Sequence, residues 1–262
     1  MSDGKPNYKK RSLFTKENFL EGIRYPHKIF LSLYNRTRLS ILRWYYVKKK
    51  GSYTDFYLKA TKDNIDEDPK GSVGPADLFE EVGEWQFQLL KRNGLEPEDS
   101  LLDIGCGVLR GGIHFIKYLQ SGNYYGMDIS EEALEKGEEF LRKEGLEYKD
   151  PVLICNQDLS FEEKKLQNKK FDFILAQSVF THLPRKEIKQ CLDNIHKVLS
   201  DDGTFYATFN KSTDDVYVKR RGIDRFHTLK FYEELASETK VQVKEVPSNH
   251  PNGLSLLQIQ TN

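Results

Sequence analysis

The stretch SLLDIGCGVLRGGIHFIKYL, Ser100–Leu119, decides the fold. It begins with apolar residues typical of a buried strand, passes through a glycine-rich turn and ends in a helical pattern. A strand, a glycine turn and a helix in this order form the ligand crevice at the carboxyl ends of parallel strands. The stretch therefore predicts a parallel sheet and the edge of that sheet where a ligand binds.

An acid, Asp103, stands directly before the turn. Its charge would repel the pyrophosphate that a GxGxxG turn normally binds. Gly105 and Gly107 match the first two glycines of that pattern, but Arg110 takes the third position. A ligand with a cationic head and no phosphate suits this turn better, and S-adenosylmethionine carries an ammonium and a sulfonium.

The residues after the turn alternate between apolar strands and amphipathic helices, which predicts an α/β fold with helices on both faces of the sheet. A helix and a strand pair at the end add one antiparallel C-terminal strand to a mostly parallel, seven-stranded sheet. The expected strands are Ser100–Ile104, Asn123–Met127, Val152–Cys155, Phe171–Ala176, Gly203–Phe209, Val241–Val246 and Leu254–Gln260. The expected helices are Phe79–Asn93, Gly111–Tyr118, Glu131–Gly145, Pro184–Leu199 and Thr228–Glu238.

The N-terminal part differs in charge from the rest. Residues 1–60 hold fourteen Lys and Arg against four acids, a net charge of +10, whereas the whole chain of 262 residues is neutral. Pro26–Val47 interleaves aromatic and basic residues in one or two expected helices, and the Asp-, Pro- and Gly-rich Asp63–Asp77 reads as a linker or a loop that can close over a site. We therefore expect residues 1–78 to form a basic helical extension with a linker or lid, and residues 79–262 to form the α/β domain.

With these motifs, residues 79–262 resemble the class I S-adenosylmethionine-dependent methyltransferases. The first motif of that family is an acid followed by GxGxG, matched here by Asp103, Gly105 and Gly107, with Leu109 in place of the third glycine. Asp128 lies 21 residues beyond Gly107, the spacing at which a carboxylate binds ribose hydroxyls. The resemblance implies a Rossmann-like fold with S-adenosylmethionine as its cofactor.

The resemblance also assigns cofactor contacts. In ICNQDLSF, Asp158 would accept the adenine amino group and the Leu159 N–H would face the ring. Cys106 is expected in the turn because it is small and not because it is reactive. The full set of expected cofactor residues is Asp103, Gly105, Cys106, Gly107, Arg110, Asp128, Ile129, Asp158, Leu159 and Gln177. No metal site is expected.

The acceptor side is expected at the end of the fourth strand, in FDFILAQSVFTHLP. Ser178 leaves that strand and His182 opens the next helix, where a histidine can act as the general base for a hydroxyl. A capping or packing role for His182 is the alternative. His227 and His250 are expected in loops that could line the acceptor pocket.

Several phrases, among them NYYGMDIS, GTFYATF and NHPNGLSLLQI, resemble the methyltransferase branch often found alongside glycan and polysaccharide biosynthesis. This implies methylation of an oxygen, hydroxyl or carboxylate, on a small-molecule, sugar or lipid-linked glycan acceptor. The alternatives are an RNA or nucleotide methyltransferase that uses the basic N-terminal arm, and a cofactor-binding module without turnover. The net charge of −10 beyond residue 60 disfavours a long nucleic-acid track.

The location of the protein is predicted from three sparse cysteines and an N-terminus without the apolar stretch of a signal peptide. Both features favour a cytoplasmic protein. Pro26–Val47 could in addition lie at an anionic membrane surface. A lid packed on the catalytic domain is the alternative role for this segment, and the oligomeric state is not predicted.

Overall fold

A computed structural model describes residue 34 and residues 37–74, 76–214, 217–219 and 224–262. The chain divides into two compact units, Met1–Phe56 and Tyr57–Asn262. Residues 26–33, 35 and 36 of the basic, aromatic segment lie outside the described residues. The remainder is helical at 37–43 and continues as a π-helix over Trp44–Lys49. The expected boundary after residue 78 stays a prediction.

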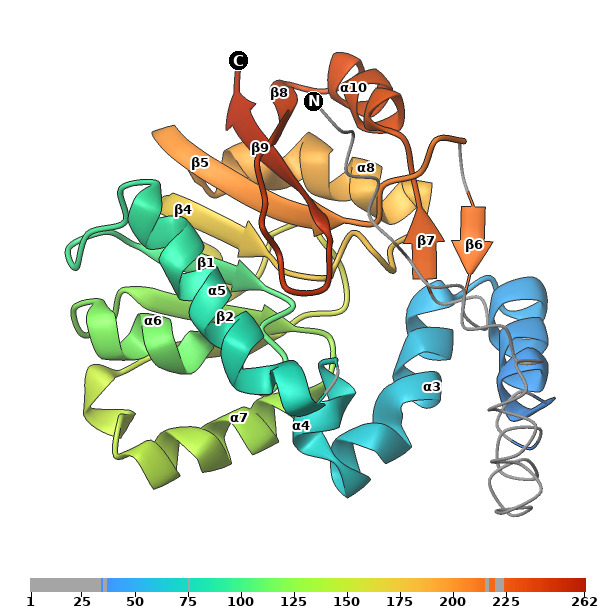
Figure 1. Cartoon of the computed structure of the whole chain (residues 1–262), viewed down its shortest axis with the longest axis horizontal. Helices are drawn as coiled ribbons and strands as arrows, with labels where there is room; N and C mark the ends of the chain where they lie inside the picture. The colour runs from blue at the N-terminus through green and yellow to red at the C-terminus, as the bar shows by residue number, and fades with distance from the viewer. Residues whose placement is uncertain (1–33, 35–36, 75, 215–216, 220–223) are drawn as a thin grey trace, which may run out of the picture. The chain divides into compact units, whose positions relative to one another are not determined.

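The second unit contains a seven-stranded sheet in the order β3-β2-β1-β4-β5-β9-β8 (Figure 1). The strands from β3 to β5 pair in parallel, and β9 runs antiparallel to both of its neighbours. The predicted fold class is therefore confirmed. The strands are β1 (Leu101–Ile104), β2 (Tyr124–Asp128), β3 (Val152–Cys155), β4 (Phe171–Ala176), β5 (Leu199–Phe209), β8 (Val241–Val246) and β9 (Ser255–Thr261), with β6 (Tyr217–Lys219) and β7 (Asp224–Phe226) in a separate two-stranded sheet.

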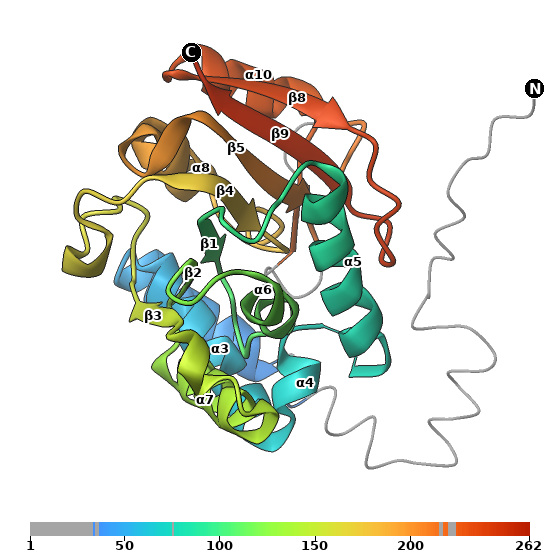
Figure 2. The ribbon, with the colours of Figure 1, turned by 90° about the vertical axis from the view of Figure 1, so that its left-hand side faces the viewer.

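Helices cover both faces of the large sheet and can be followed in Figures 1 and 2. Along β4, Ile174 and Ala176 belong to one apolar cluster and Leu175 to the other, because successive strand residues point to opposite faces. The first cluster includes residues of α8 (Arg185–Asn194) and α10 (Leu229–Ser237). The second includes residues of α5 (Phe79–Arg92), α6 (Gly112–Tyr118) and α7 (Glu131–Glu144).

The start of α7 shows how local sequence positions the site. Ser130 precedes the helix, and its side chain accepts a hydrogen bond from the Ala133 N–H at 3.2 Å. Such a cap stabilises a helix by about 1 kcal/mol. Because Asp128 lies just before this cap, the end of β2 and the start of α7 are held in one defined turn.

The prediction of a linker over Asp63–Asp77 is wrong for most of its length. Helix α3 (Tyr53–Glu67) covers its first part, and α4 (Pro69–Ser72) and a 3₁₀ helix (Ala76–Leu78) cover much of the rest. The Asp68 side chain accepts from the Gly71 N–H at 3.0 Å, and Pro69 takes the first helical position. The same Asp and Pro residues that suggested a loop thus start a helix.

The helix predicted over Pro184–Leu199 is shorter than expected. Helix α8 ends at Asn194, and one 3₁₀ turn, Ile195–Lys197, follows. Leu199 continues the apolar stripe of the helix in sequence, but it pairs with Phe171 as the first residue of β5. An apolar residue suits either element, so helical periodicity alone could not locate this boundary.

Candidate cofactor and active site

The glycine turn leaves β1 and is hydrogen bonded to the end of β2. The N–H groups of Gly105 and Cys106 donate to the Met127 carbonyl oxygen at 2.6 and 3.1 Å. Gly105 and Gly107 have φ angles of +70° and +54°, which glycine adopts without strain. A Cβ atom at Gly105 would lie 2.4 Å from Val179 Cγ2. Both glycines are therefore required by the tight path of the backbone.

The segment before α5 lies against the same turn. A Cβ atom at Gly107 would lie 2.7 Å from Val73 Cγ1, and Arg110 Nη1 donates to the Val73 carbonyl at 2.6 Å. Burial lowers the pKa of Arg110 to about 10, and its Nε has no hydrogen-bond partner among the described residues. Leu109, in the place of the third glycine of the family, adopts the left-handed φ of +64° that explains the usual glycine. Arg110 thus joins the covering segment to the turn and keeps one buried donor for a ligand.

Asp103 is a buried carboxylate with one unused oxygen. Tyr124 Oη donates to its Oδ2 at 2.8 Å, whereas its Oδ1 has no hydrogen-bond partner within the described part of the chain. Burial raises the pKa of Asp103 to about 7, and the nearby Asp128 charge adds to the rise. The hydrogen bond from Tyr124 and the charge of Arg110 both oppose it. A cation that reached Oδ1 would satisfy the atom and favour its ionised form.

Asp128 ends β2 beside the turn. Its Oδ2 accepts from the Gly107 N–H and its Oδ1 from the Ser130 N–H, both at 2.9 Å. Burial raises its pKa, and these backbone donors oppose the rise. Each carboxylate oxygen can accept a second hydrogen bond, so two acceptor positions remain for ribose hydroxyls. The carbonyl of the next residue, Ile129, lies 3.8 Å from Cys155 Sγ.

The expected adenine-binding loop follows β3. The Asn156 N–H donates to the Asp128 carbonyl at 2.9 Å, and Asn156 Oδ1 accepts from the Asp158 N–H at 2.8 Å. Asp158 is exposed and accepts from the Ser160 N–H at 2.8 Å, while Leu159 packs against the core. Sequence reasoning missed Asn156, whose only signal is its place two residues before the expected acid.

Cys106 is buried, and burial raises the pKa of its thiol well above the usual range. It is therefore a neutral thiol and a poor nucleophile, as its predicted role requires. A Cβ atom at Gly126 would lie 2.9 Å from Cys106 Sγ, so the space around this side chain is small. All three cysteines of the chain are free.

Gln177 and His250 meet beside Trp85. Gln177 Nε2 donates to Ser178 Oγ at 3.0 Å and lies 2.8 Å from His250 Nε2. His250 Nδ1 accepts from the Asn252 N–H at 2.9 Å, so the ring proton is on Nε2. If the nitrogen and oxygen of the Gln177 amide are exchanged, its oxygen accepts from the His250 Nε2–H and from the Ser178 hydroxyl. Burial, aided by the Arg110 charge, lowers the pKa of His250 to about 4, and its ring packs edge-on to Trp85 at 4.4 Å. His250 is thus a neutral hydrogen-bonding residue and is poorly suited to act as a base.

His182, which was expected at the acceptor side, lies in a turn before α8 and does not open that helix as predicted. Its Nδ1 is 3.4 Å from Asp224 Oδ1, and its ring centroid is 5.6 Å from that of Tyr57. The Arg225 Nε donates to the His182 carbonyl at 3.0 Å, which fixes β7 against this turn. Sequence reasoning missed Asp224, because no local pattern connects it to a residue so distant in the chain.

His227 was predicted to lie in a loop that could line the acceptor pocket, but its side chain packs among aromatic rings. It is 2% exposed, and its ring stacks on Phe231 at 3.9 Å and meets Tyr232 edge-on at 5.8 Å. The apolar surroundings make His227 a packing residue. Ser178, in contrast, is half-buried at the end of β4, with a left-handed φ of +58° and an N–H that donates to Thr208 Oγ1 at 2.7 Å.

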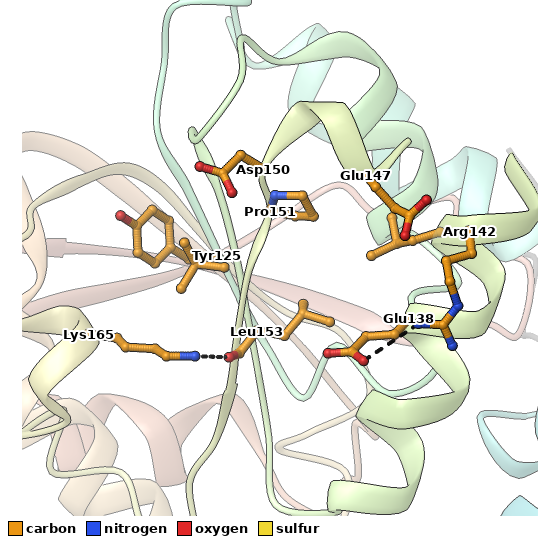
Figure 3. A pocket seen from close by; sticks show the side chains of 10 residues that line it. Tyr125, Glu138, Arg142, Glu147, Asp150, Pro151, Leu153 and Lys165 are labelled. Atoms are coloured by element: carbon orange, nitrogen blue, oxygen red, sulfur yellow. Dashed lines mark hydrogen bonds and ion pairs between the residues drawn. The ribbon is translucent and has the colours of Figure 1, made fainter. Parts of the chain in front are cut away.

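A recess of about 590 Å³ opens at the far edge of the sheet (Figure 3). It is lined by residues of β2, α7 and the start of β3, among them Tyr125, Arg142 and Asp150. Lys165 lies at one side of it and donates to the Leu153 carbonyl at 2.8 Å. This recess lies at the amino end of β3 and contains none of the predicted site residues, so it is not the candidate cofactor site.

The glycine-turn edge fits S-adenosylmethionine. Asp103 Oδ1 is a buried acceptor for the ammonium and Arg110 Nε a buried donor for the carboxylate of its amino-acid end. Asp128 keeps acceptor positions for the ribose, and Gly105 and Gly107 leave room for close approach of the backbone.

Comparisons with known proteins agree with this geometry. Residues 102–205 match the family model described as a methyltransferase domain. An uncharacterised methyltransferase of Schizosaccharomyces pombe, C1B3.06c, is 35% identical over 90 residues, which are 34% of this chain and 32% of that protein. The chain thus aligns with about a third of the length of that curated relative.

Solved structures share the fold at low sequence identity. Magnesium protoporphyrin IX methyltransferase from Synechocystis, with bound S-adenosylmethionine, has a TM-score of 0.58 at 15% identity and covers 79% of this chain and 94% of its own. The glycopeptide N-methyltransferase MtfA, with S-adenosylhomocysteine, has a TM-score of 0.57 at 12% identity and covers 69% and 90%. Residues 102–205 thus match a methyltransferase-domain family, and the chain shares its fold with methyltransferases solved with S-adenosylmethionine or S-adenosylhomocysteine.

Proposed function

We propose that this protein methylates an oxygen, a hydroxyl in preference to a carboxylate, on a small-molecule, sugar or lipid-linked glycan acceptor. The observation that carries the proposal is the pairing of His182 with Asp224 near the carboxyl end of β4. When bound, S-adenosylmethionine supplies an electrophilic methyl group on a sulfonium. A hydroxyl must lose its proton to accept that group, and a histidine is the usual base near neutral pH.

The contacts of His182 suit this role. The Asp224 carboxylate lies on the Nδ1 side of the ring, where it favours the tautomer that carries its proton on Nδ1. Nε2 is then the atom that accepts the proton of the substrate. The His182 N–H donates to the Val179 carbonyl at 3.0 Å, so the backbone of the turn also holds the residue in position.

The acceptor class is supported by two further observations. The structural relatives are named for a porphyrin and a glycopeptide acceptor, neither of which is a nucleic acid. Residues 61–262 carry a net charge of −10, which disfavours a long polyphosphate at the catalytic unit. These observations favour a small-molecule or glycan acceptor over RNA.

The test uses radiolabelled methyl donor with panels of sugars, glycolipids and RNA, followed by alkali treatment of the product. A hydroxyl acceptor yields an alkali-stable ether and a carboxylate acceptor an alkali-labile ester. Label in RNA alone would contradict the acceptor class. Binding of S-adenosylhomocysteine without any turnover would identify a cofactor-binding module instead.

His182→Ala should lower kcat by about 10²–10⁴-fold while the affinity for S-adenosylhomocysteine changes little. Asp224→Asn should lower kcat less, because the amide can still hold the ring but no longer stabilises the imidazolium that forms when Nε2 takes the proton. His196→Ala is the matched control, since it removes a histidine from the turn after α8. Equal kcat in His182→Ala and His196→Ala would make His182 structural.

A further inference from the structure

The helix through residues 37–49 leaves large apolar side chains in solvent. Ile41 and Trp44 are 61% and 60% exposed, and Tyr45 is 37% exposed. Ile41 lies three and four residues before Trp44 and Tyr45, so helical geometry brings these side chains to one face. Tyr34, seven residues before Ile41 in the sequence, is 58% exposed, whereas Leu39 is buried. A helix of a soluble domain normally turns its apolar stripe inward, so this exposed stripe indicates an interaction surface.

The charge around this stripe has one sign. Residues 37–50 contain five basic side chains and no acid, and three of them are the consecutive Lys48, Lys49 and Lys50. Lys50 Nζ lies 5.2 Å from the ring centroid of Tyr45 and 5.4 Å from that of Tyr46. Lys50 therefore borders the aromatic side chains directly, and the surface combines apolar area with positive charge.

We propose that Tyr34, Ile41, Trp44 and Tyr45, together with Lys48–Lys50, bind the surface of an anionic lipid bilayer. Apolar and aromatic side chains on a helix enter the boundary between headgroups and acyl chains, and lysines beside them attract anionic headgroups. No helix in the described part of the chain is long and apolar enough to cross a membrane. The contact is therefore peripheral, and it would bring the methyltransferase domain to lipid-linked acceptors.

Lipid explains this surface better than nucleic acid does. Tyrosine and tryptophan rings could stack on bases, and the lysines could contact phosphates. Ile41, one of the two most exposed of these side chains, offers neither stacking nor a hydrogen bond, but it contributes area to a hydrocarbon interface. The inference thus commits to a lipid surface, and nucleic acid and self-association become outcomes of the test.

The experiment measures co-sedimentation of the full chain with phosphatidylcholine vesicles, with and without phosphatidylserine, at low and high salt. We expect binding only to the anionic vesicles, weakened by salt because surface charge attraction is screened. Replacing Lys48, Lys49 and Lys50 together by Gln should reduce partitioning by about 100-fold, from roughly 1 kcal/mol per lysine. Replacing the exposed Lys164, Lys186 and Lys240 by Gln removes the same charge elsewhere and should change it little.

Trp44 also reports its own environment. The chain contains two tryptophans, so a Trp85→Phe background leaves Trp44 as the only tryptophan whose emission is followed. Its emission should shift to the blue with anionic vesicles, and Trp44→Ser in the unchanged background should weaken sedimentation at least tenfold. Retained S-adenosylhomocysteine binding in each Lys and Trp44 variant shows that the domain is folded and separates this test from that of the proposed activity.

Three results would overturn the inference. Sedimentation that Trp44→Ser does not alter would place the contact elsewhere. Saturable binding to poly-uridylate, lost in the Lys48–Lys50 variant and without vesicle binding, would assign the surface to nucleic acid. A dimer in light scattering that Trp44→Ser dissociates, again without vesicle binding, would assign it to a second copy of the chain.

Discussion

Asp103→Asn should make the cofactor-free protein more stable at about pH 8. The side chain is 1% exposed, and burial raises the pKa of its carboxyl from 3.8 to about 7. A rise of roughly 3 units corresponds to at most about 4 kcal/mol at 1.36 kcal/mol per unit. Asparagine has the same shape and no charge, and it can keep the contact with Tyr124. The variant therefore avoids the cost of an ionised, buried group.

The sign of the pH dependence follows from the raised pKa. The folded protein binds the Asp103 proton more tightly than the unfolded chain, so the proton-linked stability is fully present below about pH 4. It is lost as the pH rises through about 7. The stability of wild type relative to Asp103→Asn should thus fall across this window and level off above it.

The affinity for the cofactor should rise with pH over the range in which the stability of the cofactor-free protein falls. The ammonium of the ligand needs the ionised carboxylate, so wild type should bind S-adenosylhomocysteine about tenfold more weakly at pH 6 than at pH 8, given the pKa of about 7. Asp103→Asn should bind about 10- to 100-fold more weakly at pH 8, the effect of losing a hydrogen bond to a charged group. Its remaining affinity should vary little over the same range.

Thermal unfolding and calorimetric titration between about pH 5 and 8 measure both effects. A change of 1 kcal/mol shifts the Tm of a domain of this size by about 2–4 °C, so a shift of several degrees is expected. Asp201→Asn removes an exposed carboxylate and serves as the matched control. A variant of Asp103 that is less stable than wild type at pH 8 and binds the ligand normally would refute this account.

Three further predictions concern the same edge of the sheet. Asp128→Ala should weaken S-adenosylhomocysteine binding by about 10- to 100-fold in calorimetry, because the ribose hydroxyls lose their acceptor. Asp158→Ala changes an exposed carboxylate and tests the adenine contact in parallel. Unchanged binding in either variant would remove that residue from the site. Gly105→Ala should lower the free energy of unfolding by about 1–3 kcal/mol in urea titration, because φ is +70° and the new Cβ would meet Val179. The control Gly122→Ala, with φ of +82° and open space around it, should lower the free energy of unfolding less. Equal losses in the two variants would contradict the role of Val179. Wild type should lose stability as the pH falls from about 6.5 to 4, because the lowered pKa of His250 means that the folded state binds fewer protons than the unfolded chain. His250→Gln removes this group and should make that loss smaller. An unchanged dependence of stability on pH would contradict the lowered pKa.

Much of the fold was predictable because it depends on local periodicity. The strands Val152–Cys155, Phe171–Ala176 and Val241–Val246 were predicted with their observed bounds, since each is a short apolar or alternating run between turn residues. Errors arose where one residue type serves two elements. Asp68 and Pro69 suggested a loop but start a helix, and Leu199 suggested a helix but starts a strand.

The motifs along the chain by themselves determined the parallel sheet and the cofactor edge, because Asp103, Gly105, Gly107 and Asp128 act through the ends of neighbouring strands. Only the tertiary structure decided which distant groups meet there. It brings Asp224 to His182, Val73 to Arg110, and His250 to Gln177, and it packs the ring of His227 into an aromatic cluster. A periodic pattern specifies which face of an element is buried, but contacts between residues far apart in sequence depend on how the elements pack, and no local pattern records that.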